Sequence, residues 1–538
     1  MIDDHKRLVT QSKLAVEFDE NKIDAIFADI DQCHLPGAAV GIAIGGKPIY
    51  RKGFGLASME LPVLLSPTIR LRIHSTTKHF TALAYMLLCE EGKAGIDDPI
   101  GKYLPELHPV THQVTARQLM GNIGGLRDVH DICWQFSGTG LPVSTADLLS
   151  LYRTIDDANA APGTAWTYNN GGWLMMSVAI ERITGESLDD VLRQRIFEPV
   201  GMHDTRLRRV DSDFVPNSAS MHMTNPAGGY EKSYLGGTLT GEAGMVSTVD
   251  DMLRWLAHMA TPIVGSSATW ETLKAPQRLI NGASTHYGLG LQSDRYRGVE
   301  TVFHPGGGMG CNSQMLKVPE ACLDIVILVN REDISGILLV DKVLDACLPD
   351  LDPIKTPVAR PLVTGIFRSP TTGRVIQMFG KQGQQIASID GMDMPVEPDE
   401  NGVLWPAGIY RYAKVAITLG GDSSDPLSIG VNDFGNVDEL TREVPADEVD
   451  VAMIAGLYRS DTTYTEATIS ETHEGPQLKT IGRFGSTVYR LRCLSEGIWQ
   501  AKTTSVFWRG GILMFDRDSR AFRFSTYRTR ALTFHRDV

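Results

Sequence analysis

Three short motifs contain the residues of this chain that could carry out chemistry together. They are Ser75-Thr76-Thr77-Lys78, Tyr168-Asn169-Asn170 and His304-Pro305-Gly306. A serine hydroxyl is a weak nucleophile near neutral pH and needs an adjacent base. Ser75 precedes an apolar run that predicts a buried helix ending at Gly92. Because residues three apart share a helix face, we expect Lys78 to reach the Ser75 hydroxyl, with burial lowering the pKa of Lys78.

The second motif lies in a predicted turn, ahead of a run typical of a helix that ends at Gly185. A phenol such as Tyr168 can move protons when a neighbouring cation lowers its pKa. We expect Asn170 to hold both the lysine and the substrate carbonyl. Two structural alternatives stay open: a core tyrosine beside a turn asparagine, and a helix N-cap serine followed by a surface lysine.

The third motif lies between strand-like residues 301–303 and 313–318. Its glycines would let a strand edge lie close to a substrate backbone. We expect His304 to donate a hydrogen bond to the substrate or to help the tyrosine move protons. The backbone N–H groups of Ser75 and Gly307 would form an oxyanion hole. A strand follows the glycines where a dinucleotide loop requires a helix, so that interpretation fails. A strand-end histidine with a satisfied ring is the structural alternative.

Strand-like and helical segments alternate up to about residue 350, opening with a hairpin near residues 38–57. Prolines at 349, 353, 357 and 361 then indicate a linker. Beyond it the segment Gly-Ile-Phe-Arg-Ser at 365–369 recurs as Gly-Leu-Tyr-Arg-Ser at 456–460. This repeat predicts two β units, and closure into barrels would remove exposed strand edges.

Composition narrows the class of protein. The chain has 538 residues and a net charge of −13, which argues against nucleic acid or an anionic membrane surface as partner. We find no secretory core at the start and no apolar run near the roughly 20 residues that span a bilayer. Seven scattered cysteines, Cys311 among them as a core residue, favour free thiols in a cytoplasmic protein. His108 and His112 flank Pro109 in a predicted loop, which we interpret as a chance pair rather than a metal site.

The three motifs in this order resemble those of the penicillin-recognising serine enzymes, in their class C-like branch, with His-x-Gly in place of Lys-Thr-Gly. Over nearly its whole length the chain is most similar to the bacterial D-aminopeptidases of that family. The resemblance implies an α+β serine β-lactamase/penicillin-binding-like catalytic domain followed by two small antiparallel β-barrel domains. We expect the catalytic domain at residues 1–350 and the barrels at 361–446 and 447–538.

The resemblance also implies a serine hydrolase that cleaves amide bonds of small peptides or amino-acid amides through an acyl-enzyme on Ser75. The expected catalytic residues are Ser75, Lys78, Tyr168 and His304, and the expected substrate-binding residues are Asn170 and Gly307. We expect a small-molecule or short-peptide substrate, no cofactor, no metal, no nucleic acid and no membrane partner, and leave a homodimer open. The alternatives are an esterase with the same machinery and a catalytically inactive ligand-binding or sensor protein.

Two departures from the resembled family bear on the substrate. Those enzymes hold the free amine of the substrate with an acidic residue from the last barrel. The matching stretch here, residues 501–511, has no carboxylate and offers Lys502 and Arg509. We therefore expect that the pocket does not demand a free α-amine. His304 also replaces the lysine that faces the drug carboxylate in β-lactamases, so we expect poor β-lactam turnover.

Overall fold

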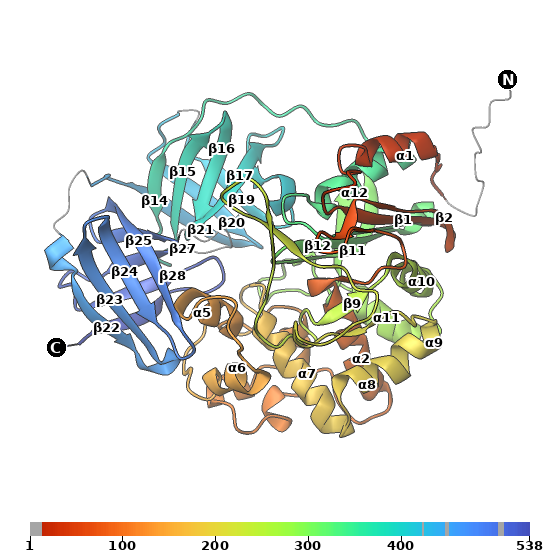
Figure 1. The fold of residues 1–538 in the computed structure, drawn as a ribbon. Helices are drawn as coiled ribbons and strands as arrows, with labels where there is room; N and C mark the ends of the chain where they lie inside the picture. The colour runs from red at the N-terminus through yellow and green to blue at the C-terminus, as the bar shows by residue number, and fades with distance from the viewer. Residues whose placement is uncertain (1–12, 422–423, 447–450, 504–509, 538) are drawn as a thin grey trace.

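The computed structural model describes residues 13–421, 424–446, 451–503 and 510–537. It has an α+β part and two closed barrels (Figure 1). The centre of the α+β part is a six-stranded antiparallel sheet in the order β10-β11-β12-β13-β1-β2. Its strands are β1 (Ala38–Ile44), β2 (Lys47–Phe54), β10 (Gln292–Tyr296), β11 (Val299–Gly308), β12 (Cys311–Val318) and β13 (Leu323–Val329).

Helices cover both faces of this sheet, and the side chains of β1 show why. Val40 and Ile42 pack into a core with α1 (Glu20–Phe27) and α12 (Gly336–Cys347) on one face. The opposite face carries Ala39, Gly41 and Ala43, which are small. A Cβ atom at Gly41 would lie 2.4 Å from the Val249 side chain. The small residues therefore let α10 (Val249–Ala260) pack closely against the sheet.

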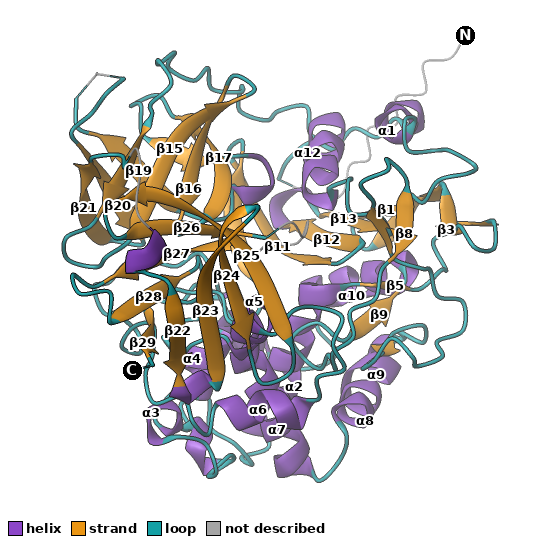
Figure 2. Cartoon of the chain, turned by 60° about the vertical axis from the view of Figure 1, so that its left-hand side comes forward, coloured by secondary structure: helices purple, strands orange, loops and turns teal. Residues whose placement is uncertain are grey.

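A helical layer lies beside the sheet, centred on α2 (Lys78–Glu90) and α7 (Asn170–Thr184), which pack against each other (Figure 2). The other helices are α3 (Pro109–His112), α4 (Ala116–Met120), α5 (Val129–Phe136), α6 (Thr145–Leu151), α8 (Leu188–Leu192), α9 (Glu198–Val200) and α11 (Ser267–Lys274). Short strands join them: β3 (Leu56–Ser58), β4 (Val63–Leu64), β5 (Leu71–Arg72), β6 (Arg206–Leu207), β7 (His222–Thr224), β8 (Tyr230–Lys232) and β9 (Met245–Ser247).

Two sequence-based boundaries need correction. The predicted loop around Pro109 is wrong, because α3 begins there, with proline at a first-turn position where its missing N–H is tolerated. Helix α7 begins at Asn170, so both following glycines are helical. Gly171 lies there because a Cβ atom would meet the Tyr152 hydroxyl at 2.1 Å. Among the described residues, no three His, Cys, Asp or Glu side chains gather as a metal site would require.

Both predicted barrels are present, each closed by eight antiparallel strands. The first contains β14 (Gly365–Arg368), β15 (Val375–Lys381), β16 (Gln384–Ile389), β17 (Met392–Pro398), β18 (Leu404–Pro406), β19 (Val415–Leu419), β20 (Ser428–Asp433) and β21 (Asn436–Glu443). The second contains β22 (Gly456–Ser460), β23 (Thr465–Thr472), β24 (Gly475–Ile481), β25 (Ser486–Ser495), β26 (Ile498–Lys502), β27 (Gly510–Phe515), β28 (Ala521–Ser525) and β29 (Leu532–Arg536).

The repeated Gly-x-aromatic segment has the same structural role in both barrels. Gly365 and Gly456 begin the first strand of each barrel with φ of 150° and 153°. An added Cβ atom would approach the guanidinium of Arg442 in the first barrel and of Arg536 in the second. Each arginine comes from the last strand and lies over the aromatic ring of the repeat, at 5.5 and 5.7 Å. The glycine thus makes room for an arginine at the seam where the barrel closes.

The second barrel shares one hydrophobic core with the catalytic part. Phe136, the last residue of α5, is 1% exposed and lies 5.2 Å from the ring of Phe524 and 5.4 Å from that of Phe534. The backbone oxygen of Phe136 accepts a hydrogen bond from the Thr480 hydroxyl at 3.1 Å. The barrel is therefore docked on the end of α5.

We expect Phe136→Ala to lower the free energy of unfolding by about 3–5 kcal/mol, the usual result of removing a buried aromatic ring from a core. Urea unfolding of the full chain followed by tryptophan fluorescence measures the change. Phe214→Ala is the control, because Phe214 is 98% exposed. Equal unfolding midpoints for the two variants would contradict a shared core.

No helix in the described ranges is both long and apolar enough to cross a membrane.

Candidate active site

Ser75 lies in a 3-10 turn, His74–Thr77, directly ahead of α2. The edge of β11 holds this turn in place. A Cβ atom at Gly306 would lie 2.0 Å from the Ile73 backbone oxygen, and one at Gly308 would lie 2.2 Å from the His74 ring. These two glycines therefore let the strand approach the nucleophile segment, whereas a Cβ atom at Gly307 would meet nothing within 4 Å. Gly307 and Gly308 both line the cavity that contains Ser75, but only at Gly307 would a Cβ atom point into open space.

Lys78 lies one turn along α2, fully buried, with its Nζ 3.1 Å from the Ser75 Oγ. The same ammonium nitrogen donates to Asn170 Oδ1 at 2.8 Å and to the Glu242 backbone oxygen at 2.7 Å. Burial lowers the pKa of Lys78 to about 7, with the carboxylate of Glu242 opposing the shift and the charge of Arg528 adding to it. A large fraction of Lys78 is therefore neutral near pH 7, as a general base must be.

Tyr168 and Asn170 are held by the start of α7 and the loop beside it. Asn169 caps α7 by accepting the Gly172 N–H at 2.9 Å. Asp128 accepts the Asn170 N–H at 3.1 Å. The Lys78 Nζ lies 4.8 Å from the centre of the Tyr168 ring. Burial raises the pKa of Tyr168, so the phenol is neutral near pH 7 and can donate a proton.

The loop that contains Asn122 holds the residues next to Tyr168. Asn122 has a left-handed backbone, with φ of 57°. Its backbone oxygen accepts the Thr167 N–H at 2.9 Å, and its side-chain oxygen accepts the Asn169 N–H at 3.2 Å. The residues on both sides of Tyr168 are therefore fixed by one asparagine.

His304 lies behind Tyr168, with 6.5 Å between the ring centres, and is 1% exposed. Its Nδ1 lies 2.7 Å from the Pro305 oxygen, so this nitrogen carries the hydrogen, and Nε2 accepts from the Tyr287 hydroxyl at 3.1 Å. Burial lowers the pKa of His304 to about 3. The His304 ring is therefore neutral, and both of its nitrogens have hydrogen-bond partners in the protein. His304 is not among the residues that line the cavity.

A single cavity contains Ser75, Tyr168, Asn170 and Gly307. Much of its remaining wall is apolar: Trp134, Leu141, Val143, Leu148, Leu235, Leu239 and Met309. The wall also contains polar side chains that were not predicted from the sequence, among them His130, Asp131 and Arg528. The first two follow the segment Gly125-Leu126-Arg127-Asp128 on α5, and Arg528 comes from the second barrel.

His74 and Cys311 form a buried pair beside the nucleophile. His74 has a left-handed backbone, with φ of 44°, and its Nε2 lies 2.9 Å from the Cys311 Sγ. Burial lowers the pKa of His74 to about 3 and raises the pKa of Cys311 to about 12. The thiol therefore donates to a neutral imidazole. Besides being a buried core residue, Cys311 therefore holds the side chain of His74, the residue that precedes Ser75.

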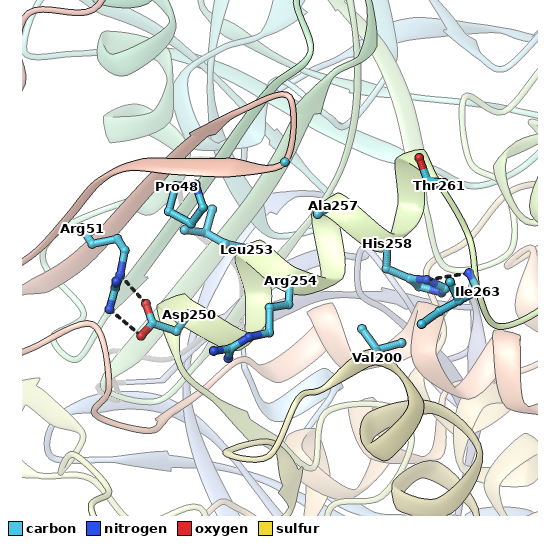
Figure 3. A pocket seen from close by; sticks show the side chains of 11 residues that line it. Pro48, Arg51, Val200, Asp250, Leu253, Arg254, Ala257, His258, Thr261 and Ile263 are labelled. Atoms are coloured by element: carbon cyan, nitrogen blue, oxygen red, sulfur yellow. Dashed lines mark hydrogen bonds and ion pairs between the residues drawn. The ribbon is translucent and has the colours of Figure 1, made fainter.

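A second pocket lies between the β1–β2 hairpin and α10 (Figure 3). Arg51 and Asp250 form an ion pair at one end of it, with Nε and Oδ1 2.7 Å apart, and His258 lies at the other. None of the residues of the Ser75 cavity lines this pocket. We therefore place the candidate active site in the Ser75 cavity alone.

The beta-lactamase family matches residues 23–346, more than half of the chain. The chain belongs to the beta-lactamase family. The matched region contains Ser75, Lys78, Tyr168 and His304 and excludes both barrels. Within this family, the predicted architecture of a catalytic domain followed by two closed barrels is confirmed.

The curated relatives of this beta-lactamase family member include the D-aminopeptidase of Brucella canis, 28% identical over 361 residues, which are 64% of this chain and 65% of that protein. The D-aminopeptidase of Brucella anthropi is 28% identical over 334 residues, which are 59% of this chain and 60% of that protein. The chain thus spans less than two thirds of the length of the curated relatives that it matches.

Solved structures share the fold at lower identity. An octameric penicillin-binding protein homologue from Pyrococcus abyssi superposes with a TM-score of 0.57 at 21% identity, covering 79% of this chain and all of that one. The D-amino acid amidase from Ochrobactrum anthropi SV3 complexed with D-phenylalanine gives 0.52 at 24% identity, covering 61% of this chain and 98% of that one.

Proposed function

We propose that this beta-lactamase family member is a serine hydrolase that cleaves amide bonds of small peptides or amino-acid amides through an acyl-enzyme on Ser75. One observation carries the proposal: a buried lysine with a pKa of about 7 lies 3.1 Å from the Ser75 Oγ. Such a lysine supplies the base that a serine nucleophile needs. The D-aminopeptidase relatives support an amide as the substrate.

In the proposed reaction, neutral Lys78 takes the Ser75 proton as Oγ bonds to the amide carbon. The carbonyl electron pair moves onto oxygen, beside the backbone N–H groups of Ser75 and Gly307. Tyr168, neutral because its pKa is raised, gives its proton to the amine nitrogen as the C–N bond breaks. Lys78 returns a proton to Tyr168. Water then attacks the acyl carbon and gives a proton to Lys78. Lys78 passes this proton to the Ser75 Oγ as the bond between Oγ and the acyl carbon breaks, which releases the carboxylic acid product and restores neutral Lys78.

The cavity wall indicates what the acyl part of the substrate contains. Leu141, Val143, Leu148 and Trp134 give it a largely apolar surface. Burying an apolar side chain there stabilises the complex by about 1.5–3 kcal/mol. We therefore propose amides with an apolar acyl side chain. We also propose a reducing compartment such as the cytoplasm, because the seven cysteines are scattered along the chain. The structure pairs none of the seven, all of which lie in described residues, in a disulfide.

A panel of D- and L-phenylalanine amides, alanine amides and the matching methyl esters tests this function. We expect amide turnover, faster for phenylalanine than for alanine, and a transient mass increase on the Ser75 peptide equal to the acyl group. Ester turnover without amide turnover would replace the amidase proposal with an esterase. If no substrate is turned over and a fluorophosphonate probe also leaves Ser75 unlabelled, the chain is a ligand-binding protein and the proposal is overturned.

A further inference from the structure

The last barrel contributes an arginine to the Ser75 cavity. The turn of residues 526–531 joins β28 to β29, and Arg528 from this turn lines the cavity with Ser75 and Tyr168. The guanidinium carbon of Arg528 lies 5.0 Å from the centre of the Tyr168 ring, and its Nη1 lies 3.8 Å from Asp128 Oδ2. Its side chain is 14% exposed. A long cationic side chain from a separate domain is therefore held beside the nucleophile.

Hydrogen bonds within the turn and from the catalytic part fix this arginine. The Thr526 hydroxyl accepts the N–H groups of Arg528 and Thr529 at 3.1 and 2.8 Å. The hydroxyls of Thr526 and Thr529 both donate to Asp131 Oδ2, at 2.9 and 2.7 Å. Asp131 belongs to α5 and lines the same cavity. The carboxylate of the catalytic part thus orients the turn that presents Arg528.

Asn159 and Arg127 of the catalytic part hold the other side of the turn. Asn159 donates to the Arg528 backbone oxygen at 2.7 Å and accepts the Arg530 N–H at 2.9 Å. Arg127 donates to the Arg530 backbone oxygen at 2.8 Å. A binding group held on a rigid support loses little freedom when a ligand arrives, which favours recognition.

Within the described ranges, the cavity lining contains one arginine, Arg528, and one carboxylate, Asp131. Asp131 is the single carboxylate among the described residues that line it, and burial together with nearby Asp128 raises the pKa of Asp131. The carboxylate of Asp128 accepts the N–H groups of Asn170, Gly171 and His130. Arg528 is the one arginine or lysine among the described residues that line the cavity.

The same wall contains His130, whose ring makes only long contacts with carboxylates. His130 is 4% exposed, and neither ring nitrogen has a hydrogen-bond partner among the described residues. Two carboxylate oxygens lie near the ring. Nδ1 is 3.6 Å from Asp128 Oδ1, and Nε2 is 3.9 Å from Glu242 Oε1. Buried polar groups usually make hydrogen bonds, so the His130 ring offers a second polar group, beside Arg528, that a ligand in the cavity can contact.

We propose that Arg528 binds a carboxylate of the substrate, so that the preferred amide carries a negative charge close to the scissile bond. A guanidinium matches a carboxylate with two parallel hydrogen bonds and would repel an ammonium. The inference rests on the proposed amide hydrolysis and narrows its substrate class. The proposed binding residue differs from the two cations noted in the sequence, Lys502 and Arg509. Lys502 forms an ion pair with Asp393 of the first barrel at 3.1 Å, and Arg509 lies outside the described residues.

Two matched substrate pairs test the proposal, each differing by a carboxylate in place of a carboxamide. The first pair, N-acetyl-aspartate and N-acetyl-asparagine 4-nitroanilides, places the charge on the acyl side. The second, N-acetyl-phenylalanine amides of 3-aminobenzoate and 3-aminobenzamide, places it on the leaving amine. Both pairs are used in D and L forms. The readout is the ratio of kcat/KM within a pair, because loss of Arg528 also raises the pKa of Lys78 and changes every rate.

We expect the wild-type chain to prefer the carboxylate member of one pair by about 10- to 100-fold, the range for a charge-assisted hydrogen bond. Arg528→Gln should bring this ratio close to one, and Arg528→Lys should keep part of it. Arg523→Gln is the control, since Arg523 is an exposed residue of β28. A ratio near one in both pairs, or a preference that Arg528→Gln leaves intact, would overturn the proposal.

Calorimetry on the Ser75→Ala variant separates this inference from the proposed function. Binding of N-acetyl-aspartate amide is compared with that of N-acetyl-asparagine amide, and 3-acetamidobenzoate with 3-acetamidobenzamide, with and without Arg528→Gln. Tighter binding of a carboxylate ligand that depends on Arg528 supports the inference even if no amide is hydrolysed. Equal binding of each matched pair contradicts it even if amides are hydrolysed.

Discussion

Ser75→Ala should reduce kcat/KM for every amide and ester by at least about 10⁴-fold, because no acyl-enzyme can form without the Oγ atom. Neighbouring groups do not replace it. Thr76 is buried and uses its hydroxyl to donate to the His304 backbone oxygen at 3.0 Å, and Thr77 is buried as well. Steady-state kinetics measures the loss, and mass spectrometry should show no acyl adduct on the variant.

A second serine variant controls for this result. Ser66→Ala removes an exposed hydroxyl that lies 3.0 Å from the Thr68 hydroxyl, away from the cavity, and should leave kcat/KM within about twofold. Circular dichroism and thermal unfolding of both variants should match those of the wild-type chain. If Ser75→Ala keeps more than about one per cent of the activity while folded, a nucleophile other than Ser75 operates and the mechanism is wrong.

The parts of this protein that could be predicted from its sequence are those set by local spacing. Ser75 and Lys78 are one helical turn apart, so their 3.1 Å contact follows from helix geometry once the segment is helical. The two barrels could be predicted from the repeated segment that begins at Gly365 and at Gly456. In the structure these glycines begin equivalent strands, and at each of them a Cβ atom would crowd an arginine. A periodic pattern or a repeat reports structure that neighbouring residues determine.

The parts that could not be predicted depend on packing between segments far apart in the chain. Arg528 reaches Tyr168 only because the second barrel docks on α5 and Asp131 holds its last turn. No short-range pattern marks an arginine in a barrel turn as a cavity residue. His304 shows the same limit: the motif located it next to the cavity, while the Tyr287 hydroxyl that satisfies its ring comes from another loop.

The glycines of the third motif show how one pattern can have two physical causes. Gly306 and Gly308 were expected to let a strand approach a substrate. In the structure they let β11 approach Ile73 and His74, and only at Gly307 would a Cβ atom meet nothing within 4 Å. A glycine in a strand indicates close approach of something, and the tertiary structure decides whether that is the protein itself or a ligand.

Replacing Lys78 should have the second largest effect. Lys78→Met keeps the length of the side chain without a titratable nitrogen and should lower kcat/KM by about 10²–10⁴-fold, the usual contribution of a general base. Lys78→Arg separates the two roles of the side chain, because an arginine keeps the positive charge and stays protonated at all working pH values. We expect both variants to lose activity alike. Lys102→Met, which removes an exposed lysine, is the control.

The pH dependence identifies the same group in the wild-type chain. Lys78 must be neutral to accept the Ser75 proton, and its pKa is about 7. kcat/KM should therefore rise about tenfold per pH unit below 7 and level off above it.

Asn170→Asp places a carboxylate where Asn170 Oδ1 now lies, 2.8 Å from Nζ. That charge adds to those of Glu242 and Asp128, which already raise the pKa of Lys78 against burial and Arg528. The rising limb should then move upward by about one to two pH units. A limb that stays in place in Asn170→Asp, or full activity in Lys78→Arg, would mean that the base is a group other than Lys78.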